Sequence, residues 1–359
     1  MTAKHFPEIF FDLHMNEEEL VSLIEERFKT VFFENVSEPL KIKRLTGGIT
    51  NRIYKVDFNG KQVLCRINGL STEKIIDRDV ELFHMQEMHK HGQGPQVHCV
   101  FKNGYIYDFI VGECTSTAEL MADKCEKIAE KLAMWHKMNI EKESRAPVLW
   151  KLINKWVDNA KGFEWSDLDK KEKFSQLNFE KVVEQCEFLQ NKIFNVKSTQ
   201  VVDPKDLNSV LDLFSVGFCH NDLLALNVLY NDQDDSVHFI DYEYCGYSYR
   251  AFDIGNHFDE YAGFDLKKND YPTRETQTKF VRKYLQTMYE GPSSHISDEM
   301  VEKYRTGIHL FACIGHIYWG VWAINQAKFS DIDFDYLSYA KGRFEWYFEE
   351  IGKVDFDSL

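Results

Sequence analysis

The segment HNDLLALN carries side chains whose types and spacing suit phosphoryl transfer. Asp222 and Asn227 are five positions apart, and Asp241 follows fourteen positions after Asn227, at the end of the apolar run VHFI. A carboxylate can accept the proton of an attacking hydroxyl, and carboxylate and amide oxygens are ligands that Mg²⁺ prefers. The pattern therefore predicts Asp222 as a catalytic base that contacts the acceptor substrate, and Asn227 and Asp241 as ligands of Mg²⁺ on bound ATP.

The same separation of acid and amide occurs in the protein-kinase sequence HRDLxxxN, which is followed by the metal-binding Asp of DFG. The alternative is that Asp222 and Asn227 only cap turns, since DLLALN and YNDQDD are rich in turn-forming residues. The catalytic interpretation is favoured because Asp241 ends an apolar strand and because a lobe of suitable make-up lies upstream. We expect His220 to support the turn rather than to react.

Two upstream backbone segments suit ATP binding. In LTGGITN, two glycines lie between predicted strands, where backbone N–H groups can approach a phosphate without obstruction by side chains; a simple turn is the alternative. The run YDFIVGE ends the lobe and is predicted to form a hinge whose backbone binds adenine. The predicted phosphate loop comprises Gly47, Gly48, Ile49, Thr50 and Asn51, and the predicted hinge comprises Asp108, Phe109 and Ile110.

Arg66 lies within the apolar strand VLCRIN, at the place where a protein kinase presents its phosphate-binding lysine. A buried cation requires an acidic partner. We expect Glu81 on the following helix to be that partner, with Asp79 as the alternative. The competing interpretation places Arg66 on the solvent-exposed face of an edge strand.

A set of aromatic residues suits binding of an ammonium ion. Trp319 and Trp322 are three positions apart in the helical run HIYWGVWAINQ and therefore share one face. Aromatic faces attract ammonium ions by roughly 0.5–2 kcal/mol each. Tyr244 and Tyr339 are further aromatic candidates, and Glu260 adds a carboxylate that can neutralise the ammonium. The alternative is that the two tryptophans belong to a hydrophobic core, and without the kinase motifs that alternative is favoured.

The N-terminal part of the chain contains the elements that must position the ATP-binding groups. Asn16 and Glu19 predict a helix N-cap, and apolar residues then recur at helical spacing. From Pro39, the alternation in KIKRLTGGITNRIYKVDFNGKQVLCRIN predicts about three antiparallel strands. A helix follows over 75–90, and GPQVHCVFKNGYIYDFI predicts two more strands. These elements form a compact sheet-containing lobe, 1–110.

Helices dominate the rest of the chain. A long apolar helix is predicted over 304–328, and the charged stretch 141–212 is expected to be helical with loop insertions. We therefore predict an α+β, two-lobed fold. The N-terminal lobe 1–110 would bind the nucleotide, and the larger, mainly helical lobe 111–359 would carry the catalytic and substrate-binding residues.

The composition excludes several classes of partner. The 359 residues include 43 Lys and Arg against 58 Asp and Glu, a formal net charge of −15. Nucleic acid and anionic membrane surfaces are disfavoured, since clustered basic residues hold them. No apolar run approaches the roughly 18 residues of a membrane span. The N-terminus lacks the pattern of a secretion signal, and eight cysteines form no CxxC pair. We expect a cytoplasmic protein with reduced thiols.

Together these segments resemble the choline/ethanolamine kinase family over about 45–348. The resemblance is carried by TGGITN, VLCRI, HNDLL, IDYEY, FDIGNHFDE and HIYWGVWAINQAK. HNDLL, YEYCGYSYRAFDIGNHFDEYAG and IDFDYLSYA are closer to ethanolamine kinases than to choline kinases. The resemblance implies a protein-kinase-like fold and phosphorylation of ethanolamine or choline with ATP and Mg²⁺, the first step of phosphatidylethanolamine or phosphatidylcholine synthesis. It also favours the amine-binding role of Trp319 and Trp322, and it leaves homodimerisation open.

Two residues need separate mention within this resemblance. Leu224 stands where many choline kinases have Gln, which puts one contact on the ATP side in question. Asp253, which opens DIGN, is expected to brace the catalytic loop through backbone N–H groups rather than to touch substrate. The rival functions are an aminoglycoside-type phosphotransferase and a non-catalytic pseudokinase scaffold.

Overall fold

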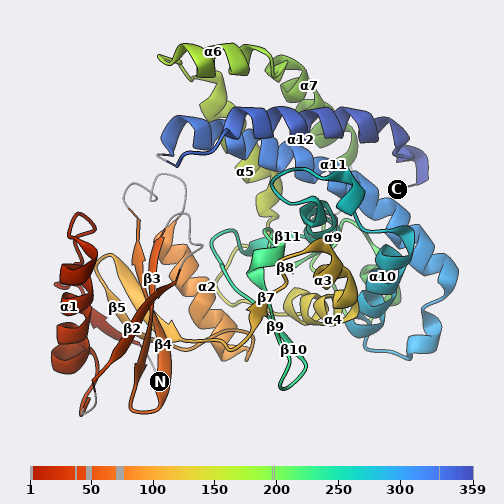
Figure 1. Ribbon diagram of the computed structural model, residues 1–359. Coiled ribbons are helices and arrows are strands. Elements are labelled where there is room, and N and C mark those ends of the chain that lie inside the picture. The colour runs from red at the N-terminus through yellow and green to blue at the C-terminus, as the bar shows by residue number, and fades with distance from the viewer. Residues whose placement is uncertain are drawn as a thin grey trace. The chain divides into compact units, whose positions relative to one another are not determined.

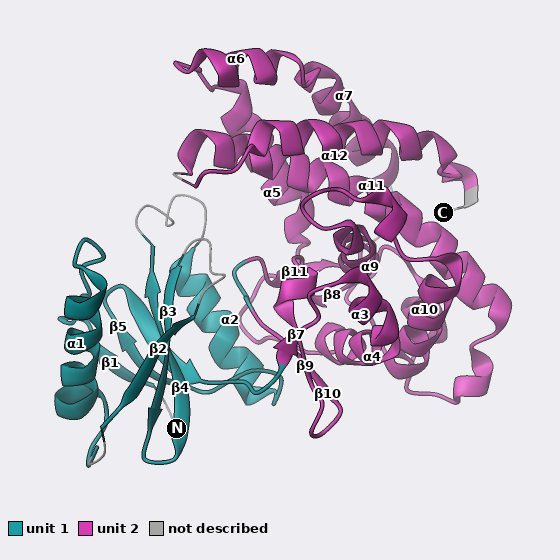
Figure 2. Cartoon of the chain, viewed as in Figure 1, with its two compact units in different colours: residues 1–112, 241–243 teal, residues 113–240, 244–359 magenta. Residues whose placement is uncertain are grey.

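The computed structural model of the protein describes residues 3–36, 39–45, 51–69, 77–195, 197, 199–330 and 332–358. The chain divides into two compact units, one of 1–112 with 241–243 and one of 113–240 with 244–359 (Figure 2). The added segment 241–243 contains Asp241. One of the predicted metal ligands therefore groups with the N-terminal unit, which the order of the sequence alone does not indicate.

A six-stranded sheet lies in the N-terminal unit (Figure 1), with strand order β1-β5-β6-β4-β3-β2. β1 runs parallel to β5, and the other neighbours are antiparallel. Five of these strands confirm the sequence prediction. The sequence does not predict β1, because three residues are too few to show the alternation of a strand. The strands are β1 (Lys4–Phe6), β2 (Lys41–Leu45), β3 (Asn51–Phe58), β4 (Lys61–Asn68), β5 (Val97–Phe101) and β6 (Gly104–Asp108).

One face of this sheet forms a hydrophobic core with the N-terminal helix. Alternate residues of β3 and β4, including Tyr54 and Cys65, cluster with Leu20 and Ile24 of α1 (Glu17–Arg27). The α-helix continues into a π-helical turn, η1 (Phe28–Phe32), which adds two buried rings to the cluster. The side chain of the N-cap residue Asn16 accepts a hydrogen bond from the N–H of Glu19, so the predicted start of this helix is confirmed.

The opposite face of the sheet lies toward α2 (Arg78–Lys90), as Figure 1 shows. Successive side chains of a strand point to opposite faces. Cys65 and Ile67 belong to the core beneath α1, so Arg66 between them points to the α2 face. The chain thereby carries a cation on a strand that is otherwise apolar without placing it in the hydrophobic core.

The C-terminal unit is mainly helical, with five short strands among its described residues, as expected for the second lobe. The charged stretch 141–212, predicted to be helical with loops, contains α5 to α8. The strands are β7 (Glu113–Cys114), β8 (Val216–Cys219), β9 (Val228–Asn231), β10 (Ser236–Phe239) and β11 (Gly246–Tyr249). The helices are α3 (Ala118–Asp123), α4 (Cys125–His136), α5 (Val148–Lys161), α6 (Leu168–Ser175), α7 (Phe179–Leu189), α8 (Leu207–Leu211), α9 (Arg250–Asp259), α10 (Arg274–Met288), α11 (Asp298–Phe329) and α12 (Tyr336–Glu350).

The long helix α11 packs against α5, α9, α10 and α12. It confirms the apolar helix predicted over 304–328 and extends it at the N-terminal end. By length and composition, it is the one helix within the described part of the chain that could cross a membrane. However, 89% of its most apolar window is buried inside the protein, as in a core helix. All eight cysteines are free, and seven of them are buried.

Candidate active site

The loop between β8 and β9 brings Asp222 and Asn227 together. The Asn227 side-chain amide donates hydrogen bonds from Nδ2 to the Asp222 carbonyl oxygen at 2.9 Å and to Asp222 Oδ2 at 3.2 Å. Neither bond uses Asn227 Oδ1, which is the atom that a cation would bind. Asn221 immediately precedes Asp222 with φ of +63°, a left-handed conformation that asparagine tolerates better than most residues.

Asp253 on α9 holds this loop, as the sequence predicts. Its Oδ2 accepts hydrogen bonds from the backbone N–H of His220 at 2.7 Å and from Nε2 of His136 at 3.0 Å. Its Oδ1 accepts one from the backbone N–H of Asn221 at 2.8 Å. Burial raises the pKa of Asp253, but the His136 hydrogen bond and the nearby donors outweigh it, so that this pKa lies below its ordinary value. One buried carboxylate therefore fixes two consecutive peptide groups directly before Asp222.

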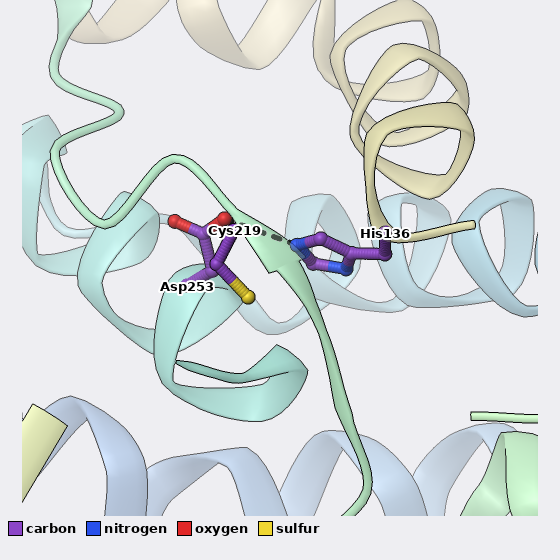
Figure 3. Close-up of side chains that lie close together, drawn as sticks. All are labelled: His136, Cys219 and Asp253. Carbon is purple, nitrogen blue, oxygen red and sulfur yellow. Dashed lines mark hydrogen bonds and ion pairs between the residues drawn. The ribbon is translucent and has the colours of Figure 1, made fainter. Parts of the chain in front are cut away.

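His136, Cys219 and Asp253 lie close enough to suggest a metal centre (Figure 3), with ligand atoms within 4.8 Å of one another. However, the Cys219 thiol donates to the carbonyl oxygens of Gly217 and Ser248, and burial raises the pKa of Cys219 well above its ordinary value. Since a metal requires the thiolate, we interpret this group as structural support for the loop.

His220 has the structural role expected for it. Its Nε2 donates to the carbonyl oxygen of Ile240 at 2.9 Å, and its Nδ1 accepts from the N–H of Asp222 at 3.3 Å. The imidazole also packs on the Trp135 ring, with centroids 5.3 Å apart. Both nitrogens are thus engaged in holding the turn.

In the N-terminal unit, Arg66 is paired with Glu81, and the alternative partner Asp79 is exposed. Arg66 Nη1 lies 2.8 Å from Glu81 Oε1, and Arg78 Nη1 lies 2.8 Å from Glu81 Oε2. The edge-strand interpretation is wrong, because β4 lies between β6 and β3 and Arg66 is 5% exposed. Burial disfavours the charged form, but Tyr105, Glu81 and Asp241 keep the pKa of Arg66 well above its ordinary value.

Acidic oxygens gather beside this ion pair. The carboxylates of Glu81, Asp241 and Glu243 each offer an atom within 4.8 Å of the others. Glu243 is also 3.9 Å from Arg66 and 3.7 Å from Arg78. Burial raises the pKa of Glu243 well above its ordinary value, and the neighbouring Asp241 raises it further. Hard oxygen donors of this kind fit a magnesium ion, and a divalent cation would relieve the repulsion between Asp241 and Glu243.

Only some of the other predicted ATP contacts lie within the part of the chain that the structure describes. Gly47, Gly48, Ile49 and Thr50 lie outside the described residues. Asn51 begins β3 and accepts a hydrogen bond from Arg78 at 3.3 Å. In the predicted hinge, the N–H groups of Asp108 and Phe109 donate to the carbonyl oxygens of Gln96 and Gln62. These two N–H groups are therefore engaged within the N-terminal unit, and the carbonyl oxygen of Asp108 and the backbone of Ile110 stay predicted adenine contacts.

On the amine side, the aromatic candidates form a continuous cluster. The rings of Trp319 and Trp322 are 5.3 Å apart, and those of Trp319 and Tyr244 are 5.6 Å apart, both edge to face. Trp322 Nε1 donates to the Tyr244 hydroxyl at 2.8 Å, and Trp319 Nε1 donates to Asn256 Oδ1. The structure thus brings together three of the four aromatic residues that the sequence selected, and it adds Asn256 as the group that orients one indole.

Glu260 and Tyr339 are joined by a residue that the sequence reasoning missed. Arg343 Nη2 donates to Glu260 Oε1 at 2.6 Å, and Arg343 Nε donates to the Tyr339 hydroxyl at 2.9 Å. Glu260 therefore already has a cationic partner, which the sequence prediction did not include. The signal was available in principle, since Arg343 lies four residues after Tyr339 on α12 and shares its face.

Comparison with known proteins identifies similar chains. The choline/ethanolamine kinase family model matches residues 42–348. The probable ethanolamine kinase A of Dictyostelium discoideum is 36% identical over 321 residues, covering 87% of this chain and 86% of that protein. Ethanolamine kinase 1 of Mus musculus is 35% identical over 320 residues, covering 86% of this chain and 83% of that protein. The solved ethanolamine kinase of Plasmodium vivax superposes with a TM-score of 0.79 at 23% identity, covering 97% of this chain and 93% of that chain. This likeness shows the protein-kinase-like fold.

Proposed function

Because the chain belongs to the choline/ethanolamine kinase family, we propose that it transfers the γ-phosphoryl group of ATP to the hydroxyl of a small amino alcohol, with ethanolamine preferred over choline. The observation that carries the proposal is the loop in which Asp222 and Asn227 are hydrogen-bonded while Asp253 fixes the two preceding peptide groups. Such a loop presents a carboxylate and an amide oxygen in fixed positions.

In the proposed reaction, Asp222 orients the substrate hydroxyl and accepts its proton as the oxygen attacks the γ-phosphorus. The bond from that phosphorus to the bridging oxygen breaks, and ADP leaves. Asn227 and Asp241 would hold Mg²⁺, which supplies positive charge to the phosphate oxygens when bound. Arg66, kept in place by Glu81, would stabilise charge on the phosphates.

Recognition of the amine would use the aromatic cluster and Glu260. A quaternary ammonium donates no hydrogen bond and depends on aromatic faces, whereas a primary ammonium donates three and gains from a carboxylate oxygen. Trp319, Trp322 and Tyr244 suit both substrates. Glu260 retains an oxygen that is not bonded to Arg343, and this oxygen favours ethanolamine.

The proposal is tested by measuring kcat/KM for ethanolamine and for choline side by side, with purified protein, ATP and Mg²⁺ and with release of ADP as the signal. A higher value for ethanolamine supports the assignment, and a higher value for choline overturns the preference. Turnover of an aminoglycoside and of neither amino alcohol would favour the aminoglycoside-type phosphotransferase. Stabilisation by ATP with Mg²⁺ but without phosphoryl transfer would favour a pseudokinase scaffold.

This activity would place the protein at the first step of phospholipid head-group synthesis, in the cytoplasm, where ATP and free amino alcohol are both available. The formal net charge of the chain, −15, attracts a cationic amine. The same net charge repels ATP, so local cations must compensate the negative charge of the triphosphate. Arg66 and the proposed Mg²⁺ would supply that compensation.

A further inference from the structure

Arg343 on α12 is completely buried and makes contacts to three polar side chains. Its Nη2 donates to Glu260 Oε1 at 2.6 Å, its Nε donates to the Tyr339 hydroxyl at 2.9 Å, and its Nη1 lies 3.3 Å from Nδ1 of His316. The guanidinium also lies over the Tyr339 ring, 5.1 Å from its centroid. All the groups concerned belong to the C-terminal unit.

Two of these contacts, to His316 and Tyr339, hold Arg343 in place, and the third is the ion pair with Glu260. His316 is itself fixed, because its ring stacks on Trp346 with centroids 4.5 Å apart. Tyr339 packs against Phe264 and Phe334. Two packed side chains, Tyr339 and His316, therefore contact the arginine, and its remaining end meets the Glu260 carboxylate. A planar guanidinium with diverging N–H groups can meet all of these partners at once, whereas a lysine ammonium acts as a single point charge.

The neighbouring acid shows why Glu260 needs this partner. Asp259 is also buried, and neither of its oxygens has a hydrogen-bond partner among the described residues. Burial raises the pKa of Asp259 well above its ordinary value. Asp259 Oδ1 lies 3.6 Å from Nε2 of His316, whereas the adjacent Glu260 has a guanidinium 2.6 Å away in the same interior. Glu260 therefore has the hydrogen-bonded cationic partner that a buried carboxylate requires.

We propose that Arg343 is a positioning residue for amine recognition: it pairs with Glu260 and fixes one of its oxygens, so that the other oxygen is aimed at the substrate ammonium. This inference rests on the amine-binding role of Glu260 proposed above. It has a consequence for specificity, because a fixed carboxylate oxygen rewards a primary ammonium that can donate to it and gives no comparable gain to a quaternary one. Arg343 thereby favours ethanolamine over choline without touching either substrate.

The test compares Arg343→Lys with wild type in KM for ethanolamine, KM for choline, KM for ATP and melting temperature. Loss of a hydrogen bond to a charged group corresponds to about a tenfold or larger change in an equilibrium constant. We expect KM for ethanolamine to rise by about that factor while KM for ATP changes by less than about twofold. The ratio of kcat/KM for ethanolamine to that for choline should fall. An unchanged ratio, or an equal rise in both KM values, overturns the proposal.

Arg250→Lys is the matched control. Arg250 is as deeply buried as Arg343 and lies in the same unit, but its partners are Ser215, Tyr284 and backbone carbonyl groups. The Arg250→Lys variant should have a lower melting temperature than wild type but an unchanged ratio of KM for ethanolamine to KM for ATP. If Arg250→Lys shifts that ratio as much as Arg343→Lys does, the effect is one of general destabilisation and the proposal fails.

Two further variants keep the proposal testable if Arg343→Lys does not fold. Glu260→Gln alone should raise KM for ethanolamine. The double variant Glu260→Gln with Arg343→Met leaves the net charge unchanged and should show the KM of Glu260→Gln within about twofold, because in the proposal Arg343 acts through Glu260 and not through Tyr339. A further tenfold rise in the pair overturns the inference alone. An unchanged KM in Glu260→Gln overturns the amine-binding role of Glu260, and the inference with it.

Discussion

Replacement of Asp253 by asparagine probes the support of the catalytic loop without changing side-chain shape. The carboxylate accepts three hydrogen bonds, two at Oδ2 and one at Oδ1. An asparagine offers one oxygen and one NH₂ group, so at least one of the donors must face another donor in either orientation. The most favourable orientation keeps His220 and His136 on the oxygen and turns the NH₂ group toward the N–H of Asn221. The peptide group between His220 and Asn221, directly before the loop residue that precedes Asp222, then loses its hydrogen bond to residue 253.

The magnitude follows from these contacts. Losing one hydrogen bond to a charged group costs about 1.5–3 kcal/mol. In a chain of 359 residues, each kcal/mol lowers the melting temperature by roughly 1.3 °C. We therefore expect Asp253→Asn to lower it by roughly 2–4 °C. Displacement of the Asp222 carboxylate by about 1 Å is enough for a roughly hundredfold loss of kcat.

The assay combines a thermal melt with steady-state kinetics, and Asp259→Asn is the control. Asp259 lies on the same helix and is equally buried, but it makes no hydrogen bond within the described residues. Burial raises its pKa well above the ordinary value, which favours the neutral acid that an amide resembles in shape and charge. The control should melt within about 1 °C of wild type. If Asp253→Asn keeps both the melting temperature and kcat of wild type, the loop-support argument is refuted.

The remaining predictions concern pH and the Arg66 ion pair. Burial lowers the pKa of His257 to about 4, whereas an unfolded histidine titrates near 6.5. Because the unfolded chain takes up the proton first, the free energy of unfolding should fall as pH drops from 6.5 toward 4, by up to about 3 kcal/mol from this residue. Denaturant titrations across that range check it, and a flat profile contradicts it. Arg66→Met removes one of the two cationic partners of the buried Glu81. Because Arg78 remains, the free energy of unfolding should fall by about 3 kcal/mol, the lower end of the cost of breaking a buried ion pair. Adding Glu81→Leu should restore much of that loss in the same titration, and no recovery would show that the pair is not the cause.

The sequence predicts best where structure is decided locally. The Asn16 cap depends on residues three positions apart, and the hydrogen bond to Glu19 is where the pattern places it. The Arg66 pairing was also predictable, because a cation on an apolar strand must have an acid nearby and the next helix supplies Glu81. In both cases one physical requirement has few possible solutions.

Contacts between distant residues are harder to predict. Arg343 and Glu260 are 83 positions apart, and the residues around either one do not indicate that the two side chains pair. His136 meets Asp253 across 117 positions for the same reason. β1 is three residues long and pairs with a strand about 95 positions away, so it shows no usable periodicity. Such pairings are set by the packing of whole helices and strands, which local patterns do not encode.

The central claim is that Asp222 takes the proton of an amino alcohol whose phosphoryl donor is ATP. Its most direct test is the turnover of ethanolamine by Asp222→Ala, measured together with binding of ATP and Mg²⁺. We predict that kcat falls by about 10²–10⁴-fold, while the nucleotide binds with wild-type affinity because the loop is held from Asp253 through the backbone. A variant that phosphorylates ethanolamine at the wild-type rate would contradict this account.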